Sequence, residues 1–188
     1  MKDKLAFAFA TATTGATLYS VPSWQGFLTD ACLWASAASG LTIVVLLVTR
    51  HLGDRARLFE VKWLALFLAG MPLIYLVRWI VDGGMLAGRS GLIIELAGVL
   101  LYSALAVVGL KRYWFLAAGI AAHGIGWDIW HYYPKSAYIP SWYAIGCLVV
   151  DVGLAVYAAA RVSAWQRARQ RLQTAVPGSR AESANAGR

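Results

Sequence analysis

The sequence predicts an all-α protein that crosses a membrane several times. Its 188 residues are 60% hydrophobic and 14% charged, and the mean hydropathy is +0.59. Soluble domains carry about a quarter charged residues, so this chain is too apolar to be one. Its apolar blocks approach the ~20 residues of a spanning helix and lack the alternation of a membrane β-barrel. We therefore expect a polytopic membrane protein with six transmembrane helices.

The six predicted helices correspond to six apolar blocks. The first block is short and rich in threonine, and a cleaved signal peptide is an alternative explanation, since two lysines precede it. The other five are longer and are separated by short polar segments. In chain order the blocks are residues 5–20, 26–49, 61–81, 91–110, 113–132 and 139–160.

The chain divides into a membrane domain over residues 1–162 and a basic tail over residues 163–188. The first part of the tail is expected to continue as a basic helix on the inner membrane surface. From about Pro177 onward the composition predicts disorder.

The basic residues predict the orientation. With six spans, the loops on one side hold nearly all lysines and arginines, and the other side has only Arg89 and Lys135. Because basic loops stay in the cytoplasm, both termini are predicted to be cytoplasmic, in the inner membrane of a bacterium. The net charge is +8, but this charge flanks apolar blocks, so we expect no nucleic acid partner.

The fifth block contains the most informative segment, which runs from His123 to His131. Ionisable side chains are costly in hydrocarbon, so they usually face a protein interior or a wet cavity and mark function. At ~100° per residue, His123, Trp127 and Trp130 share one helix face, and Asp128 and His131 extend it.

Glycines in the fifth block are expected to let another helix approach closely. They are Gly119, Gly124 and Gly126, and the last two would also loosen the helix.

A short connection makes the fifth and sixth helices antiparallel neighbours. Asp151 of the sixth helix then lies at a depth similar to that of His123. We predict that His123, Asp128 and Asp151 converge on one cavity, with Trp127 in its wall.

Two more charges are expected in the outer half of the membrane. Arg78 lies near the outer end of the third helix, and Glu95 lies in the first turns of the fourth. An intramembrane arginine needs a partner, so Arg78 should pack against Asp82, Glu95 or Asp128. The inner halves of the helices are expected to be almost uniformly apolar.

The segment from His123 to Asp151 resembles the last two helices of small bacterial multipass membrane proteins. Both have a His, a Trp-Asp pair, a second His, a Pro, a Trp-Tyr pair and an Asp, which implies a shared fold. A weaker resemblance is to the integral-membrane terpene cyclases, in which Trp127, Asp128, Pro134 and Asp151 match, with Asp in place of Glu.

These residues predict that the protein binds or converts a small amphipathic molecule of the lipid or isoprenoid class. A buried acid suits acid–base chemistry, and aromatic walls suit a cationic intermediate. A proton-coupled transporter and an accessory subunit of a larger complex are the alternatives. The predicted catalytic residues are His123, Asp128 and Asp151, and the predicted binding residues are Trp127, Trp130, His131, Arg78 and Glu95.

The sequence indicates no particular cofactor. No metal site is expected, because His123 and His131 are eight residues apart and the two cysteines, Cys32 and Cys147, form no CxxC pair. Both cysteines are expected in the core. The expected partners are membrane lipids and the amphipathic ligand, and an oligomer is compatible with the short loops. No lysine lies deep enough in a helix for a retinal Schiff base.

Overall fold

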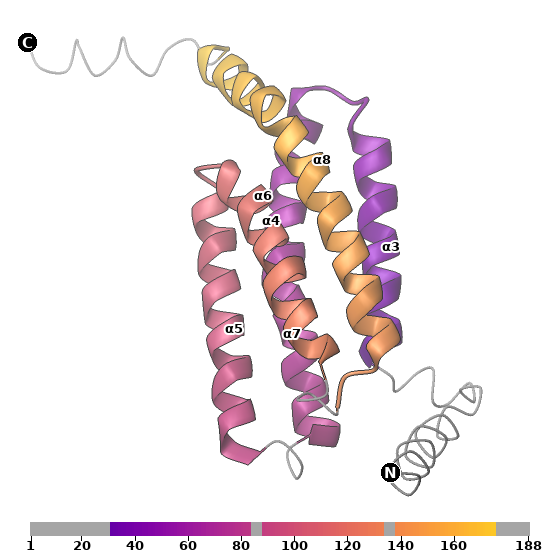
Figure 1. Cartoon of the computed structure of the whole chain (residues 1–188). Coiled ribbons are helices and arrows are strands. Elements are labelled where there is room, and N and C mark those ends of the chain that lie inside the picture. The colour runs from indigo at the N-terminus through magenta and orange to yellow at the C-terminus, as the bar shows by residue number, and fades with distance from the viewer. Residues whose placement is uncertain (1–30, 84–87, 134–137, 176–188) are drawn as a thin grey trace, which may run out of the picture.

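The structure, a computed structural model, describes residues 31–83, 88–133 and 138–175, and these residues form a bundle of antiparallel helices (Figure 1). Helix α4 is central, because it contacts α3, α5, α6 and α8. The elements are α3 (Ala31–Thr49), α4 (Asp54–Arg78), the π-helical turn η1 (Trp79–Gly83), α5 (Gly88–Gly109), α6 (Trp114–Ala122), the π-helical turn η2 (His123–Asp128), α7 (Ile129–Tyr132) and α8 (Ser141–Thr174).

Four of the described helices are long and apolar enough to cross a membrane. They cover residues 32–49, 54–81, 90–109 and 141–174. Large apolar side chains on their outer surfaces are exposed, for example Leu66 at 66%, Leu100 at 72% and Val149 at 67%. A bundle that exposes such residues along its length needs lipid around it. The protein is therefore a multipass helical membrane protein.

The predicted fifth span is a composite of α6, η2 and α7, which follow one another without a break between Trp114 and Tyr132. The π-helical turn divides it into shorter segments, so no single α-helix spans this stretch. The predicted first span, residues 5–20, lies outside the described residues, as do Pro177 and the end of the tail. The count of six spans remains a prediction.

Two helices are longer than their apolar blocks. Helix α4 begins at Asp54, seven residues before the expected start, and Arg57 stabilises its first turn through a 2.8 Å contact with Asp54. An acid at this position also interacts favourably with the helix dipole. Helix α8 runs past residue 162 to Thr174, and its Trp165 is fully buried beyond the expected domain boundary.

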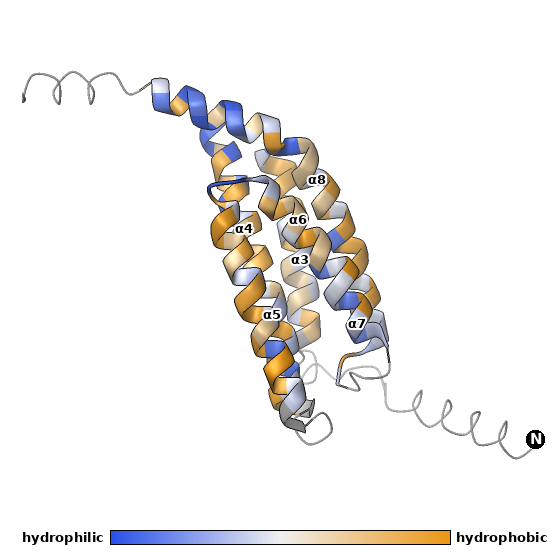
Figure 2. Ribbon diagram, turned by 60° about the vertical axis from the view of Figure 1, so that its left-hand side comes forward, coloured by the Kyte–Doolittle hydropathy of each residue, from blue (hydrophilic) through white to orange (hydrophobic). Residues whose placement is uncertain are grey.

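One end of the bundle is strongly hydrophilic. The connections from α3 to α4 and from α5 to α6 lie there, and α8 projects from it (Figures 1 and 2). We call this the basic end, because its connections carry Arg50, Lys111 and Arg112. Toward the opposite end, hydrophilic residues occur between apolar helix surfaces in α5, α7 and α8 (Figure 2).

An ion pair near the basic end joins two residues that directly flank the apolar blocks 61–81 and 139–160. Glu60 of α4 is 0% exposed, and its Oε1 lies 3.1 Å from an Arg161 nitrogen of α8. The Trp165 indole donates to Glu60 Oε2 at 2.8 Å. Sequence patterning missed this Glu60 network (Glu60, Arg161 and Trp165), because Glu60 was placed outside its helix.

Candidate functional site

The π-helical turn η2 is the local feature that builds the site. Its ladder bonds span five residues rather than four, so Asp128 comes above His123 on the same side of the helix. Asp128 is 1% exposed and His123 is 0% exposed, whereas Trp130 is 43% exposed. The expectation of one face shared by His123, Trp127 and Trp130 was wrong for Trp130, since it assumed a regular α-helix. Glycine is a poor α-helix former, so Gly124 and Gly126 weaken the competing α-helical geometry.

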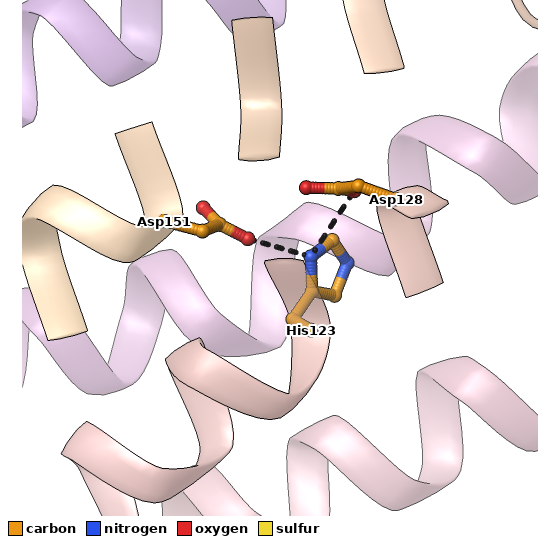
Figure 3. Close-up of side chains that lie close together, drawn as sticks. All are labelled: His123, Asp128 and Asp151. Carbon is orange, nitrogen blue, oxygen red and sulfur yellow. Dashed lines mark hydrogen bonds and ion pairs between the residues drawn. The ribbon is translucent and has the colours of Figure 1, made fainter. Parts of the chain in front are cut away.

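His123 and two aspartates meet between η2 and α8 (Figure 3). His123 Nδ1 lies 2.8 Å from Asp151 Oδ2 and 3.5 Å from Asp128 Oδ1. All three side chains are buried. The predicted meeting of the three side chains is confirmed, and we call them the His123 triad. A cavity shared by all three between the fifth and sixth helices stays a prediction.

A glycine makes the close approach of η2 to α8 feasible. A Cβ on Gly124 would lie only 2.7 Å from the Asp151 Cβ, so a larger residue would push the two segments apart. Gly119 is similarly close to Leu68, with a Cβ distance of 2.7 Å to its Cδ2. The sequence-based expectation is therefore confirmed for Gly119 and Gly124. It was wrong for Gly126, where a Cβ would meet nothing within 4 Å.

Two tyrosines surround the triad. The Tyr75 hydroxyl of α4 donates to Asp128 Oδ1 at 2.5 Å and so holds that carboxyl in place. The Tyr102 ring of α5 packs edge-on against the His123 imidazole, with ring centroids 4.8 Å apart. Its hydroxyl donates to the Ala122 carbonyl at 3.2 Å. Neither tyrosine was singled out from the sequence, because each lies in an apolar run without a distinctive pattern.

A second acid–histidine pair lies beside the triad. Glu95 of α5 is 0% exposed, and its Oε1 is 2.8 Å from His131 Nε2 and accepts a hydrogen bond from the Tyr138 hydroxyl. The other ring nitrogen of His131 lies 2.8 Å from the Trp127 carbonyl. A carbonyl only accepts, so this nitrogen carries a proton, and the contact with Glu95 needs a further proton on one partner. We call Glu95, His131 and Tyr138 the Glu95 network.

The Tyr75 ring connects the two clusters. Its centroid is 4.3 Å from that of His131 and 5.8 Å from that of His123. Both histidines therefore belong to one continuous buried region between α4, α5, α8 and the η2 segment.

Several polar atoms in this region have no hydrogen-bond partner among the described residues. They are His123 Nε2, Asp128 Oδ2, Asp151 Oδ1, Glu95 Oε2 and Trp127 Nε1. Buried polar atoms in native proteins are nearly always paired, because an unpaired one costs about 1–3 kcal/mol. Such a concentration of unpaired atoms indicates a site that receives something else.

A cavity of about 320 Å³ between α3 and α4 leads to the triad. Its walls are mostly apolar, with Leu41 and Ala38 from α3 and Leu66, Met71 and Ile74 from α4 among the lining residues. Tyr75, His123, Tyr143 and Cys147 also line it. This volume is within the usual range of ligand pockets, about 300–1,000 Å³.

The remaining predicted site residues are placed differently. The Trp127 ring packs against Gly98 of α5 and His131 rather than lining this cavity. Arg78 Nε donates to the Tyr138 carbonyl at 3.4 Å. The side chain of Asp82 is outside the described residues, so the predicted pairing of Arg78 with a carboxylate stays a prediction.

Cys32 is buried as expected, and Cys147 lies at the cavity. Comparison with protein-family models, with curated proteins and with solved structures finds no match to this chain.

Proposed function

We propose that the protein binds a small amphipathic molecule of the lipid or isoprenoid class within the membrane and acts on its polar end. The apolar part would occupy the cavity between α3 and α4, and the polar end would reach the His123 triad. The observation that carries this proposal is the continuity of an apolar cavity of about 320 Å³ with a buried, incompletely paired cluster of acids and histidine.

The chemistry of the triad suits a proton donor or acceptor. The imidazole of His123 touches both aspartates, so a proton taken from or given to a ligand can be exchanged with either carboxyl. Tyr75 acts as a positioning residue, because its hydroxyl fixes Asp128. The apolar surroundings strengthen any electrostatic contact with the ligand, because there is little water to screen it.

The proposal includes the membrane setting. We infer six spans in a bacterial inner membrane with both termini in the cytoplasm, so that the basic end of the bundle faces inward. Reporter fusions at Arg57 and Lys111 should report the cytoplasm, and fusions at Arg89 and Lys135 should report the outer side. A cytoplasmic signal at Arg89 or Lys135 would contradict this topology, in either its orientation or its number of spans.

Ligand binding in the cavity can be tested with a substitution that fills part of the cavity and leaves the His123 triad unchanged. Gly70 lines the cavity, and a Cβ there would meet nothing within 4 Å, so Gly70→Leu should fill space while the helix is retained. The matched control is Gly40→Leu on α3, which also has open space but is not a lining residue. The measurement is unbiased mass spectrometry of molecules that co-purify with each variant in mild detergent.

We expect the wild type and Gly40→Leu to retain the same lipid-class or isoprenoid-class molecule. Retention by Gly70→Leu should fall about tenfold or more, which corresponds to about 1.4 kcal/mol of lost binding. Equal retention by both variants, or a wild type that carries no such molecule, would contradict the proposal.

A further inference from the structure

We infer that the His123 triad is a binding site for one divalent transition-metal ion, with Zn²⁺ as the best-matched class. This inference goes beyond the proposed function and does not depend on it. It also revises the sequence-based expectation of no metal, which considered the pair His123 and His131. The structure instead groups His123 with Asp128 and Asp151.

The spacing of the donor atoms fits a shared ion. One donor atom from each of the three residues lies within 4.8 Å of the other two. The distances from His123 Nδ1 are 2.8 Å to Asp151 Oδ2 and 3.5 Å to Asp128 Oδ1. Zinc bonds to imidazole nitrogen and carboxylate oxygen are about 2.0–2.2 Å long, which places neighbouring ligand atoms of a tetrahedral site roughly 3.3–3.6 Å apart. The contact with Asp128 already has this separation, and the contact with Asp151 would lengthen by about half an ångström when an ion replaces the proton between the two atoms.

The charge of the triad favours a cation. Among the described residues, Asp128 and Asp151 contact His123, Tyr75 and each other, and neither acid forms an ion pair with a lysine or arginine. Two ionised carboxyls in a buried site need compensation, because an isolated buried charge is very costly. Without an ion, protons held by His123 and by the carboxyls themselves supply this compensation, whereas a divalent ion would displace those protons and balance both carboxylates.

The unpaired atoms supply the second, independent observation. Among the described residues, Asp128 Oδ2 and Asp151 Oδ1 have no hydrogen-bond partner at normal geometry, although the two residues are only 1% and 0% exposed. Figure 3 shows both carboxyl groups beside the same ring nitrogen of His123, each joined to it by one dashed line. A bound ion would give these carboxylates the interaction that the protein does not provide.

The surroundings match those of a reactive metal centre. Metal-ligating carboxylates are commonly oriented by a further hydrogen bond, and Tyr75 supplies one to Asp128. Three protein ligands leave a fourth position open in a tetrahedral zinc site. His123 also borders the cavity between α3 and α4, so this open position has a route to a ligand.

The test uses the full chain in detergent, stripped of metal with a chelator and then given Zn²⁺ alone. Bound zinc is measured by elemental analysis after desalting, and the thermal unfolding midpoint is measured with and without zinc. The variants are Asp151→Asn and His123→Gln. The matched controls carry the same substitutions outside the triad, Asp54→Asn and His51→Gln, and circular dichroism checks that each variant is folded.

We expect about one zinc per chain, with a raised midpoint, for the wild type and both controls. Asp151→Asn and His123→Gln should bind no zinc and show no shift. Mg²⁺ should not substitute, because it prefers oxygen ligands to imidazole. If His123→Gln does not fold, Asp151→Asn decides the matter.

Zinc content in Asp151→Asn equal to that of the wild type, or no zinc and no shift in the wild type, would overturn the inference. Mass spectrometry of co-purifying molecules in the same samples separates the two proposals. A retained amphipathic ligand without zinc would refute only the metal site. Bound zinc without such a ligand would refute only the proposed function.

Discussion

The Glu60 network and the His123 triad both contain buried acids and residues of α8, but they differ in how completely the polar atoms of those acids are paired. Both oxygens of Glu60 accept hydrogen bonds, from Arg161 and Trp165, and the guanidinium neutralises the charge. In the triad, each aspartate keeps one unpaired oxygen, and no basic side chain other than His123 contacts either one in the described part of the chain. A fully satisfied network can be purely structural, whereas an unsatisfied one is unfavourable until something binds.

The two regions also differ in their surroundings. Trp165 of the Glu60 network is a member of the apolar core, and Arg161 is only 20% exposed. The triad borders a cavity, and it depends on a glycine for the approach of η2 to α8. We therefore expect substitutions in the Glu60 network to change stability and substitutions in the triad to change binding.

The largest loss of stability is expected from Arg161→Met. Removing the guanidinium leaves a buried carboxylate without a counter-charge, which should lower the free energy of unfolding by about 3 kcal/mol. The double variant Glu60→Leu with Arg161→Met should recover much of that loss, since the unpaired charge is gone. Unfolding in detergent measures both, and ligand retention at low temperature should not change. If Arg161→Met also lost the ligand, the Glu60 network would contribute to binding, and the proposed difference between the two regions would be wrong.

A smaller loss is expected from Gly124→Ala, at the triad itself. The new methyl group would lie 2.7 Å from the Asp151 Cβ, so η2 and α8 must separate. Overpacking of this kind costs about 1–3 kcal/mol, and we expect about 2 kcal/mol together with loss of ligand retention.

Gly126→Ala is the control for this substitution, because it lies in the same turn and faces open space. It should leave retention unchanged and keep the free energy of unfolding within about 1 kcal/mol of the wild type. Equal effects of the two substitutions would mean that the turn, rather than the contact with α8, determines the result.

The sequence predicted the fold class and the approximate helices, because apolar blocks of this length have few other stable arrangements. It also predicted the meeting of His123 with Asp151, since a short connection fixes two helices as antiparallel neighbours and depth can be counted along each. Gly119 and Gly124 were identifiable as points of close helix contact because glycine has no side chain to keep a neighbouring helix away.

The other features of the site could not be predicted, because they depend on the rotation of each helix about its axis and on contacts between residues far apart in the sequence. The π-helical turn places Asp128 on the side of the helix that faces the bundle interior and Trp130 on the exposed side. The presence of glycines in the segment does not by itself predict a π-helical turn. Tyr75 and Asp128 are separated by 53 positions, and Glu60 and Arg161 by 101. Such pairs depend on which faces of α4 and α8 meet, and periodicity in nearly uniform apolar sequence does not reveal that.

The smallest change in stability is expected from Asp151→Asn, although it should have the largest effect on binding. Asparagine has almost the same shape, and its carbonyl oxygen can still accept from His123 Nδ1. The substitution also removes a buried negative charge that the described protein groups do not fully compensate. We therefore expect the free energy of unfolding of the ligand-free protein to change by less than about 1 kcal/mol, in either direction. Glu60→Gln, the equivalent change in the other region, removes the counter-charge of Arg161 and should cost about 2 kcal/mol, less than Arg161→Met, because Arg161 is 20% exposed. Denaturation and co-purification measured on both variants test the contrast directly. If Asp151→Asn were as destabilising as Glu60→Gln and retained the ligand, the triad would be a structural network like the one around Glu60.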